Sequence, residues 1–202
     1  MEVIEYRKRT VMDFTTELED FTGKLLVATP NTSPNSYFAK TVIYIVKYSQ
    51  EEGTIGLIVN QPLPLNNSPA LTKHKTTNLN VDNLHLNNLE TYIGGPVDVD
   101  KGFLLHSDLA CSTETNSIYL TSNIKLLKNI ATGKGPKHSM FLFGYCGWGN
   151  GQLEAEIKNN EWLLLPEDKG IIFETSNMEK WSRAIGQLKI NPIRYINKPG
   201  NC

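Results

Sequence analysis

The first part of the chain alternates between short apolar runs and polar turns. Three runs rich in β-branched and aromatic residues occupy residues 24–29, 41–48 and 54–60. Such runs are typical of strands, and the polar segment 49–53 predicts that the last two form a β-hairpin. Those two runs are apolar almost throughout, so we expect their strands to be buried on both faces of a sheet.

Further short apolar runs, bounded by Gly, Pro, Asn or Ser, also predict strands. They lie at residues 91–93, 102–106, 117–121, 138–144 and 171–174. The run at 138–144 leads into a segment dense in glycine, which predicts a strand followed by a tight turn.

Three segments show helical spacing of apolar residues. One runs from a Ser or Asn cap to Gly133. The segment 153–165 fits a helix or a strand, and the preceding glycine turn favours a helix. In the third segment, Ser176 and Glu179 form a capping box ahead of an amphipathic helix. Its expected apolar face comprises Met178, Trp181, Ile185 and Leu188.

The mixture of strands and helices predicts an α+β fold in one domain. The chain has 202 residues, 40% of them apolar and 20% charged, which is ordinary for a globular protein with a substantial core. Residues 1–20 mix both charges without periodicity, so we expect an N-terminal extension before a single domain at residues 21–202. Residues 60–90, rich in Asn, predict a long irregular loop, either a binding lid or a tolerated surface insertion.

Charge and cysteine content narrow the function class. A formal net charge of −1 argues against direct nucleic-acid binding. No apolar run is long enough to span a membrane, and no signal-peptide core follows the basic residues near the start. Cys111, Cys146 and Cys202 lack paired spacing, which favours free thiols in a reducing compartment. We therefore expect a cytoplasmic protein, with no metal site because the histidines are widely spaced.

Several short motifs occur in a fixed order along residues 22–190. They read GKLLVATP at 23–30, GTIGLIVNQP at 53–62, GGPV at 94–97, GFLLHS at 102–107 and GYCGWG at 144–149. In this order they resemble the YqgE/AlgH family of bacterial proteins (UPF0301, DUF179). The resemblance implies a single compact α+β domain with a curved, partly barrel-like mixed sheet flanked by helices. It implies no catalytic residues, and it links the chain only by name to transcriptional control.

The glycine-rich run at residues 144–152 is the main candidate site. Cys146 takes the place of the serine in a nucleophile elbow, with His106 or His138 as a candidate base, but a tryptophan replaces the last glycine. The run also approaches an anion cradle of backbone amides, although it lacks the dinucleotide and Walker patterns. The candidate ligand loop comprises Gly147, Trp148, Gly149, Gly151 and Gln152.

A stretch without acidic residues surrounds this run. Between Thr115 and Leu153 there is no Asp or Glu, whereas lysines stand at Lys125, Lys128, Lys134 and Lys137. These lysines form either an anion patch or an ordinary solvated face. Tyr145, Trp148 and Trp162 line either a partner groove or the core, and we expect the core.

Two function classes follow from these patterns. The preferred one is a non-enzymatic binding or regulatory protein without a cofactor, whose partner is an unidentified small anion or protein. The alternative is a nucleotide- or anion-binding protein, or an enzyme, that uses residues 144–152.

Overall fold

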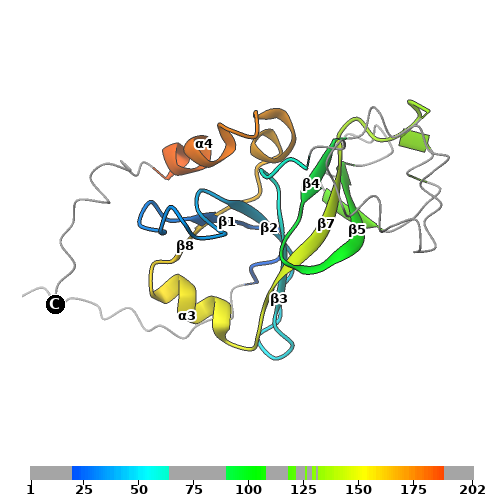
Figure 1. Ribbon diagram of the computed structural model, residues 1–202. Coiled ribbons are helices and arrows are strands. Elements are labelled where there is room, and N and C mark those ends of the chain that lie inside the picture. Colours follow the sequence, from blue (N-terminus) through cyan, green and yellow to red (C-terminus); the bar gives the residue numbers. More distant parts are fainter. Residues whose placement is uncertain are drawn as a thin grey trace, which may run out of the picture.

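The computed structural model describes residues 20–63, 90–107, 118–121, 126, 129–130 and 132–188 (Figure 1). Within these ranges an eight-stranded sheet is accompanied by short helices. The strands are β1 (Leu25–Ala28), β2 (Val42–Lys47), β3 (Thr54–Ile58), β4 (Thr91–Ile93), β5 (Val97–Ser107), β6 (Ile118–Thr121), β7 (Ser139–Trp148) and β8 (Trp162–Leu165). The helices are α3 (Gln152–Lys158), the π-helix η5 (Gly170–Glu174) and α4 (Lys180–Gln187).

The sheet is curved and mixed, as predicted, and it is not closed into a barrel. Its strands follow the order β6-β5-β7-β3-β2-β1-β8, with β4 pairing on β7. The β4–β7 pair is parallel and the other pairs are antiparallel. The hairpin predicted over residues 41–60 is confirmed, because β2 and β3 pair with Tyr44 opposite Leu57.

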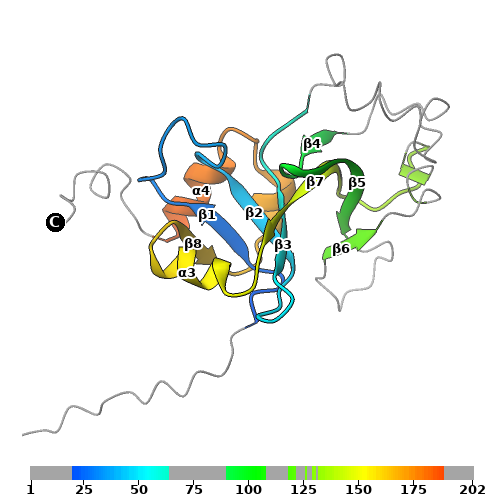
Figure 2. The same cartoon turned by 60° about the horizontal axis from the view of Figure 1, so that its bottom comes forward.

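Strand β7 joins the two halves of the sheet. Residues 139–143 pair with β4 and β5, whereas residues 146–148 pair with β3. Between these stretches lies Gly144, whose φ of 70° bends the strand. Figure 2 shows the consequence, with β5 and β6 leading away from the half that contains β1, β2 and α3.

The central strands are buried on both faces, as the apolar runs predicted. In β1, Leu25 and Val27 face one core cluster, and Leu26 and Ala28 face a second cluster on the opposite side. Helix α4 packs on the first face and α3 lies on the other, so β1 and β2 run between them (Figure 1). This alternation is the period-two geometry of a strand covered on both sides.

The predicted helix over residues 153–165 is wrong in its second half. The helix ends at Lys158, and Asn160 adopts a left-handed φ of 60° in the turn that follows. Residues 162–165 then form β8, which pairs with β1 and places Leu165 opposite Leu25. Pairing along the edge of the sheet outweighed the helical spacing of the apolar residues.

The predicted strand at residues 171–174 is also wrong, because this segment is the π-helix η5. The Asp168 carboxylate accepts a hydrogen bond from the Ile171 amide at 2.9 Å, and Thr175 donates to the Gly170 carbonyl at 2.7 Å. Winding the chain lets the consecutive residues Ile171 and Ile172 both enter the same core cluster. In a strand they would point to opposite faces of the sheet.

Helix α4 forms where a helix was expected, but its start differs. Ser176 donates to the Glu179 carboxylate at 2.6 Å and does not cap the helix through its side chain. Met178 lies before the helix and is 95% exposed, so its assignment to the apolar face was wrong. Among the described helices, none has the length and apolar character needed to cross a membrane.

Three expectations fall on residues outside the described ranges. They are the extension at residues 1–20, apart from its last residue, most of the Asn-rich segment 60–90, and most of the helix expected to end at Gly133. These remain predictions.

Candidate functional site: a cavity beside the glycine run

Residues 144–148 of the glycine run belong to strand β7, so the turn that the sequence predicted is confined to the end of the run. Gly147 pairs with Ile55 of β3, so the strand continues through Trp148, and the turn comes at residues 149–151. The strand extends this far because β3 supplies backbone partners for it. This strand pairing bears on function, because a backbone amide that is hydrogen-bonded to a neighbouring strand is less available to a ligand.

One of the amides proposed for an anion cradle is already engaged within the protein. The Gly149 amide donates to the side-chain oxygen of Gln152 at 3.0 Å, which occupies it. Gly151 has a left-handed φ of 69° and immediately precedes α3, as expected of a turn residue. Gly149 and Gly151 therefore lie in the turn that joins β7 to α3.

A cavity of about 880 Å³ opens beside the end of β7. Its wall comes from the end of β1, the loop at residues 31–38, the last residues of β7, α3, and the turn that leads into β8. Figure 2 shows β1, β8 and α3 adjacent to one another on this side of the molecule. A volume of this size is in the range of sites for small-molecule ligands.

The wall combines aromatic and polar side chains. Phe38, Trp148 and Trp162 supply the aromatic part. The polar part consists of hydroxyls, amides and two carboxylates: Thr29, Thr32, Ser33, Ser36, Asn31, Gln152, Asn159, Asn160, Glu156 and Glu161. Of the candidate ligand-loop residues, Gly147, Trp148 and Gln152 line this cavity, whereas Gly149 and Gly151 do not.

Glu156 organises one side of the cavity. One carboxylate oxygen accepts the indole N–H of Trp148 at 2.7 Å and that of Trp162 at 2.8 Å. The other oxygen accepts an N–H of Gln152 at 2.8 Å. Both tryptophans are buried, with 6% and 5% exposure, which confirms that they belong to the core. Buried indole N–H groups need an acceptor, and this carboxylate satisfies both.

Cys146 also lines the cavity, but as a buried thiol. It is 2% exposed, and its Sγ donates to the Gly94 carbonyl at 3.6 Å. Burial raises the pKa of the thiol to about 12, so it stays protonated at neutral pH. A thiolate is the reactive form of cysteine, and this environment disfavours it.

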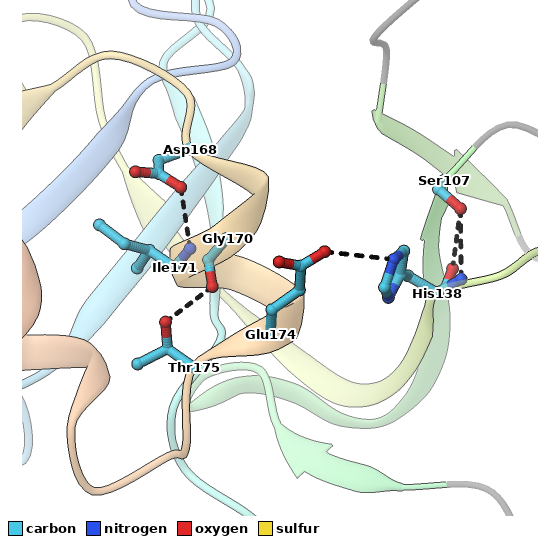
Figure 3. Close-up of polar contacts among 7 residues, drawn as sticks. All are labelled: Ser107, His138, Asp168, Gly170, Ile171, Glu174 and Thr175. Atoms are coloured by element: carbon cyan, nitrogen blue, oxygen red, sulfur yellow. Dashed lines mark hydrogen bonds and ion pairs between the residues drawn. The ribbon is translucent and has the colours of Figure 1, made fainter.

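The two described histidines are not placed beside Cys146 in the cavity wall. His106 stacks on Tyr119, and its Nδ1 lies 2.7 Å from the Ser107 carbonyl oxygen. His138 stacks on Phe173 and lies 3.5 Å from Glu174 of η5, while its backbone bonds Ser107 (Figure 3). Neither histidine lines the cavity. The structure therefore does not place the candidate base His106 or His138 beside Cys146 in the cavity wall.

The two described lysines of the candidate anion patch do not line the cavity. Lys134 and Lys137 are exposed and do not line it, and Lys137 borders a smaller cavity of about 270 Å³ near His138. Lys125 and Lys128 lie outside the described residues. In the described part of the chain, no group of three or more His, Cys, Asp or Glu side chains is arranged to hold a metal.

Sequence reasoning missed the residues that give the cavity its chemistry. Thr29 ends the strand predicted at residues 24–29, and Glu156 falls within the segment 153–165 that was expected to be helical. The polar loop at 31–36, directly after Pro30, was the one available signal, because hydroxyl and amide side chains gather there. Its position opposite α3 is a result of the fold and has no local signature.

Together, the fold and the cavity define an α+β protein with an open, curved sheet and a ligand-sized cavity between aromatic and polar walls. The chain belongs to the AlgH-like family, DUF179, whose model matches residues 25–193. It is 36% identical over 188 residues to a UPF0301 protein of Rickettsia canadensis, covering 91% of this chain and 96% of that one. A UPF0301 protein of Rickettsia africae is 35% identical with the same coverage.

Solved structures agree with this assignment. The solution structure of the AlgH protein from Pseudomonas aeruginosa is similar with a TM-score of 0.67 and 32% identity, covering 93% of this chain and 98% of that one. A crystal structure of a Corynebacterium diphtheriae protein, at 21% identity, shares the fold with a TM-score of 0.63 over 89% and 93% of the two chains.

Proposed function

We propose that this protein is a non-enzymatic binding protein that holds a small molecule in the cavity beside β7. The observation that supports this function is the cavity itself, about 880 Å³ in volume, with buried aromatic side chains and a rim of hydroxyl and amide groups. Binding sites commonly combine these features: a concave shape, apolar surface and a few placed polar groups.

The chemistry of the wall favours binding over catalysis. The Cys146 thiol is held in its unreactive form by burial, and none of the described histidines lines the cavity to serve as its base. Glu156 is engaged by two indole N–H groups and an amide, which suits a positioning role. A regulatory protein that responds to a ligand needs a site of this kind and no catalytic group. A free thiol at Cys146 supports the cytoplasm as its compartment.

The alternative of a nucleotide or another anion has less support. The lining carries two carboxylates, Glu156 and Glu161, and no lysine or arginine among the described residues. Two negative charges beside a ligand disfavour a phosphate or carboxylate by Coulomb repulsion.

A thermal-shift screen tests the proposal. The panel contains polyols, monosaccharides, amines, amino acids, nucleotides and dicarboxylates, and a compound that binds the folded state raises the melting temperature according to its concentration and affinity. Ser33→Trp fills the cavity from its exposed rim, and Ser182→Trp places the same bulk on the exposed side of α4, away from the cavity.

We expect at least one class of compound to stabilise the wild type and the Ser182→Trp variant but not Ser33→Trp. A panel in which every stabilising compound acts equally on Ser33→Trp would overturn the proposed site. A panel without any stabilising compound would overturn small-molecule binding as the function.

A further inference from the structure

Thr29 lines the cavity and carries a hydroxyl that no described residue engages. The residue is 3% exposed and lines the cavity at the end of β1. Its backbone is fully engaged, because its amide donates to the Glu161 carbonyl and its carbonyl accepts from the Thr32 amide. Within the described residues the hydroxyl has no hydrogen-bond partner. The same is true of buried Thr54, which does not line the cavity, whereas the buried hydroxyls of Thr41 and Thr91 donate to backbone carbonyls.

An unpartnered hydroxyl in a buried position is unusual. Buried polar groups are nearly always hydrogen-bonded, and an exception calls for a water, an ion or a ligand. Thr29 lines an open volume, so a molecule bound there is the candidate partner for its hydroxyl.

The charge of the cavity wall indicates the charge of the molecule that binds there. Glu156 is a part-buried carboxylate whose three hydrogen-bond donors are neutral: two indoles and one amide. Glu161 adds a second carboxylate at the rim. Neither has an ion-pair partner among the described residues, in contrast to Glu52, whose partner Lys47 lies 2.6 Å away. The wall is therefore negative without internal compensation.

We infer that the cavity takes a small organic cation whose primary ammonium groups donate hydrogen bonds to the Glu156 carboxylate and the Thr29 hydroxyl. This inference rests on the proposed binding function and names the ligand class for it. An ammonium has three donors and no acceptor, so it complements a wall of carboxylate, hydroxyl and amide oxygens. It also supplies the positive charge that the carboxylates lack, and charge-assisted hydrogen bonds are the stronger kind.

Three probes of equal length separate charge from shape. They are 1,4-diaminobutane, 1,4-butanediol and succinate, which carry ammonium, hydroxyl and carboxylate groups at both ends. Affinities are measured by isothermal titration calorimetry at pH 7 for the wild type and Ser33→Trp. The same titrations on Thr29→Val, Thr29→Ser, Glu156→Gln and Glu161→Gln identify the groups that bind.

We expect the diamine to bind at least about tenfold more tightly than the diol, since a hydrogen bond to a charged group exceeds a neutral one by roughly this factor. Succinate should bind more weakly than the diol. Thr29→Val, which keeps the shape of the side chain and removes the hydroxyl, should weaken diamine binding about fivefold to tenfold, and Thr29→Ser should retain it. Glu156→Gln should reduce the preference for the diamine over the diol to about twofold or less.

Glu161→Gln tests the negative charge of the wall independently of whether Glu156→Gln folds correctly. Because Glu161 is exposed, its substitution should leave the folded structure intact. It should weaken diamine binding severalfold without lowering the melting temperature. The inference is overturned if the diol or succinate equals the diamine, if none of the three binds, or if Ser33→Trp leaves diamine binding intact. The broader thermal-shift panel tests the binding function separately from the ligand class. If the panel identifies a ligand that is not a cation, the binding function is supported and the inference of a cationic ligand is overturned.

Discussion

Lys180 donates a hydrogen bond of 2.6 Å from its side-chain nitrogen to the backbone oxygen of Val59. The lysine is only 2% exposed, although it stands in the first position of α4. Its ammonium also lies 5.3 Å from the centre of the Tyr92 ring, and the Tyr92 hydroxyl donates to Glu90. A buried cation therefore anchors α4 to the segment that follows β3 and to strand β4.

This burial makes stability depend on pH in the alkaline range. Burial lowers the pKa of Lys180 from 10.5 to about 8, opposed in part by the charge of Glu90. Between these two pKa values the unfolded chain binds more protons than the folded protein, so the contribution of Lys180 to stability rises with pH from about 8 to 10.5. Below pH 8 the cost of burying the charge is present in full.

We predict that the unfolding free energy of the wild type minus that of Lys180→Met rises from pH 8 to pH 10, by up to about 1.4 kcal/mol per pH unit. Urea unfolding at several pH values measures this difference. Using the difference cancels the titration of groups that do not interact with Lys180. A difference that is flat across this range would show that folding leaves the pKa of Lys180 unchanged, so that its ammonium is not desolvated.

Cys146 has the opposite dependence. Burial raises the pKa of its thiol from 9.0 to about 12, so the folded protein holds the proton that the unfolded chain releases. The stabilisation this provides is complete below pH 9 and decreases as the pH rises toward 12. We also predict that the thiol is protected from reagents at neutral pH, because both the thiolate fraction and access are low.

The measurement is labelling with a thiol-specific disulfide reagent in a Cys111→Ser, Cys202→Ser background, where Cys146 is the remaining cysteine. We expect labelling at least about a hundredfold slower than in urea-unfolded protein, since the thiolate fraction falls about tenfold for each unit of pKa. Rapid labelling under native conditions would contradict the burial and revive a chemical role for this residue.

The strands were the part of the fold that local sequence predicted well. Residues 41–60 form the expected hairpin because β-branched and aromatic residues flank a polar turn, and both signals are local. The π-helix at residues 170–174 was missed because its Ile-Ile-Phe core has strand propensity. Its shape depends on a hydrogen bond that the Asp168 carboxylate accepts, on one that the Thr175 hydroxyl donates, and on room for two isoleucines in one cluster.

The candidate site was predicted only in part, for a related reason. Trp148 and Gln152 were included because they belong to a conspicuous run of glycines. Thr29 and Glu156 were not, since they lie 127 positions apart and meet only through the pairing of β1 with β8 and the packing of α3. Because the cavity is assembled from segments far apart in the chain, no spacing of residues along the sequence predicts it.

Removing the Glu156 side chain should destabilise the fold as well as the site. Glu156→Ala leaves the indole N–H groups of Trp148 and Trp162 without their acceptor in a buried setting. Each unsatisfied group costs about 1–3 kcal/mol, so we predict a loss of about 2–4 kcal/mol in unfolding free energy. Urea unfolding followed by tryptophan fluorescence measures it.

The matched control is Glu161→Ala, which removes an exposed carboxylate from the same cavity. It should change stability by less than about 0.5 kcal/mol, as exposed substitutions usually do. Equal effects of the two variants would mean that the shared acceptor contributes nothing beyond surface charge.

The glycines of the run at residues 144–152 differ in what they contribute, and alanine substitution should separate them. At Gly144, φ is 70°, and an added Cβ would lie 2.4 Å from the Gly95 carbonyl oxygen and 2.9 Å from that of Val97. These are backbone atoms that cannot move without disturbing the turn between β4 and β5. At Gly147, by contrast, the nearest atom to an added Cβ is in the Tyr145 ring, at 3.5 Å.

We therefore predict that Gly144→Ala lowers the unfolding free energy by more than about 3 kcal/mol, combining a left-handed backbone with a steric clash. Gly147→Ala should be neutral or stabilising by up to about 1 kcal/mol, because alanine suits a strand interior better than glycine. Chemical denaturation of both variants provides the comparison. A larger loss of stability in Gly147→Ala than in Gly144→Ala would contradict this prediction. The bend in β7 at Gly144 would then not be what joins the two halves of the sheet. The glycine run would have to be reconsidered as a site where the backbone contacts a ligand.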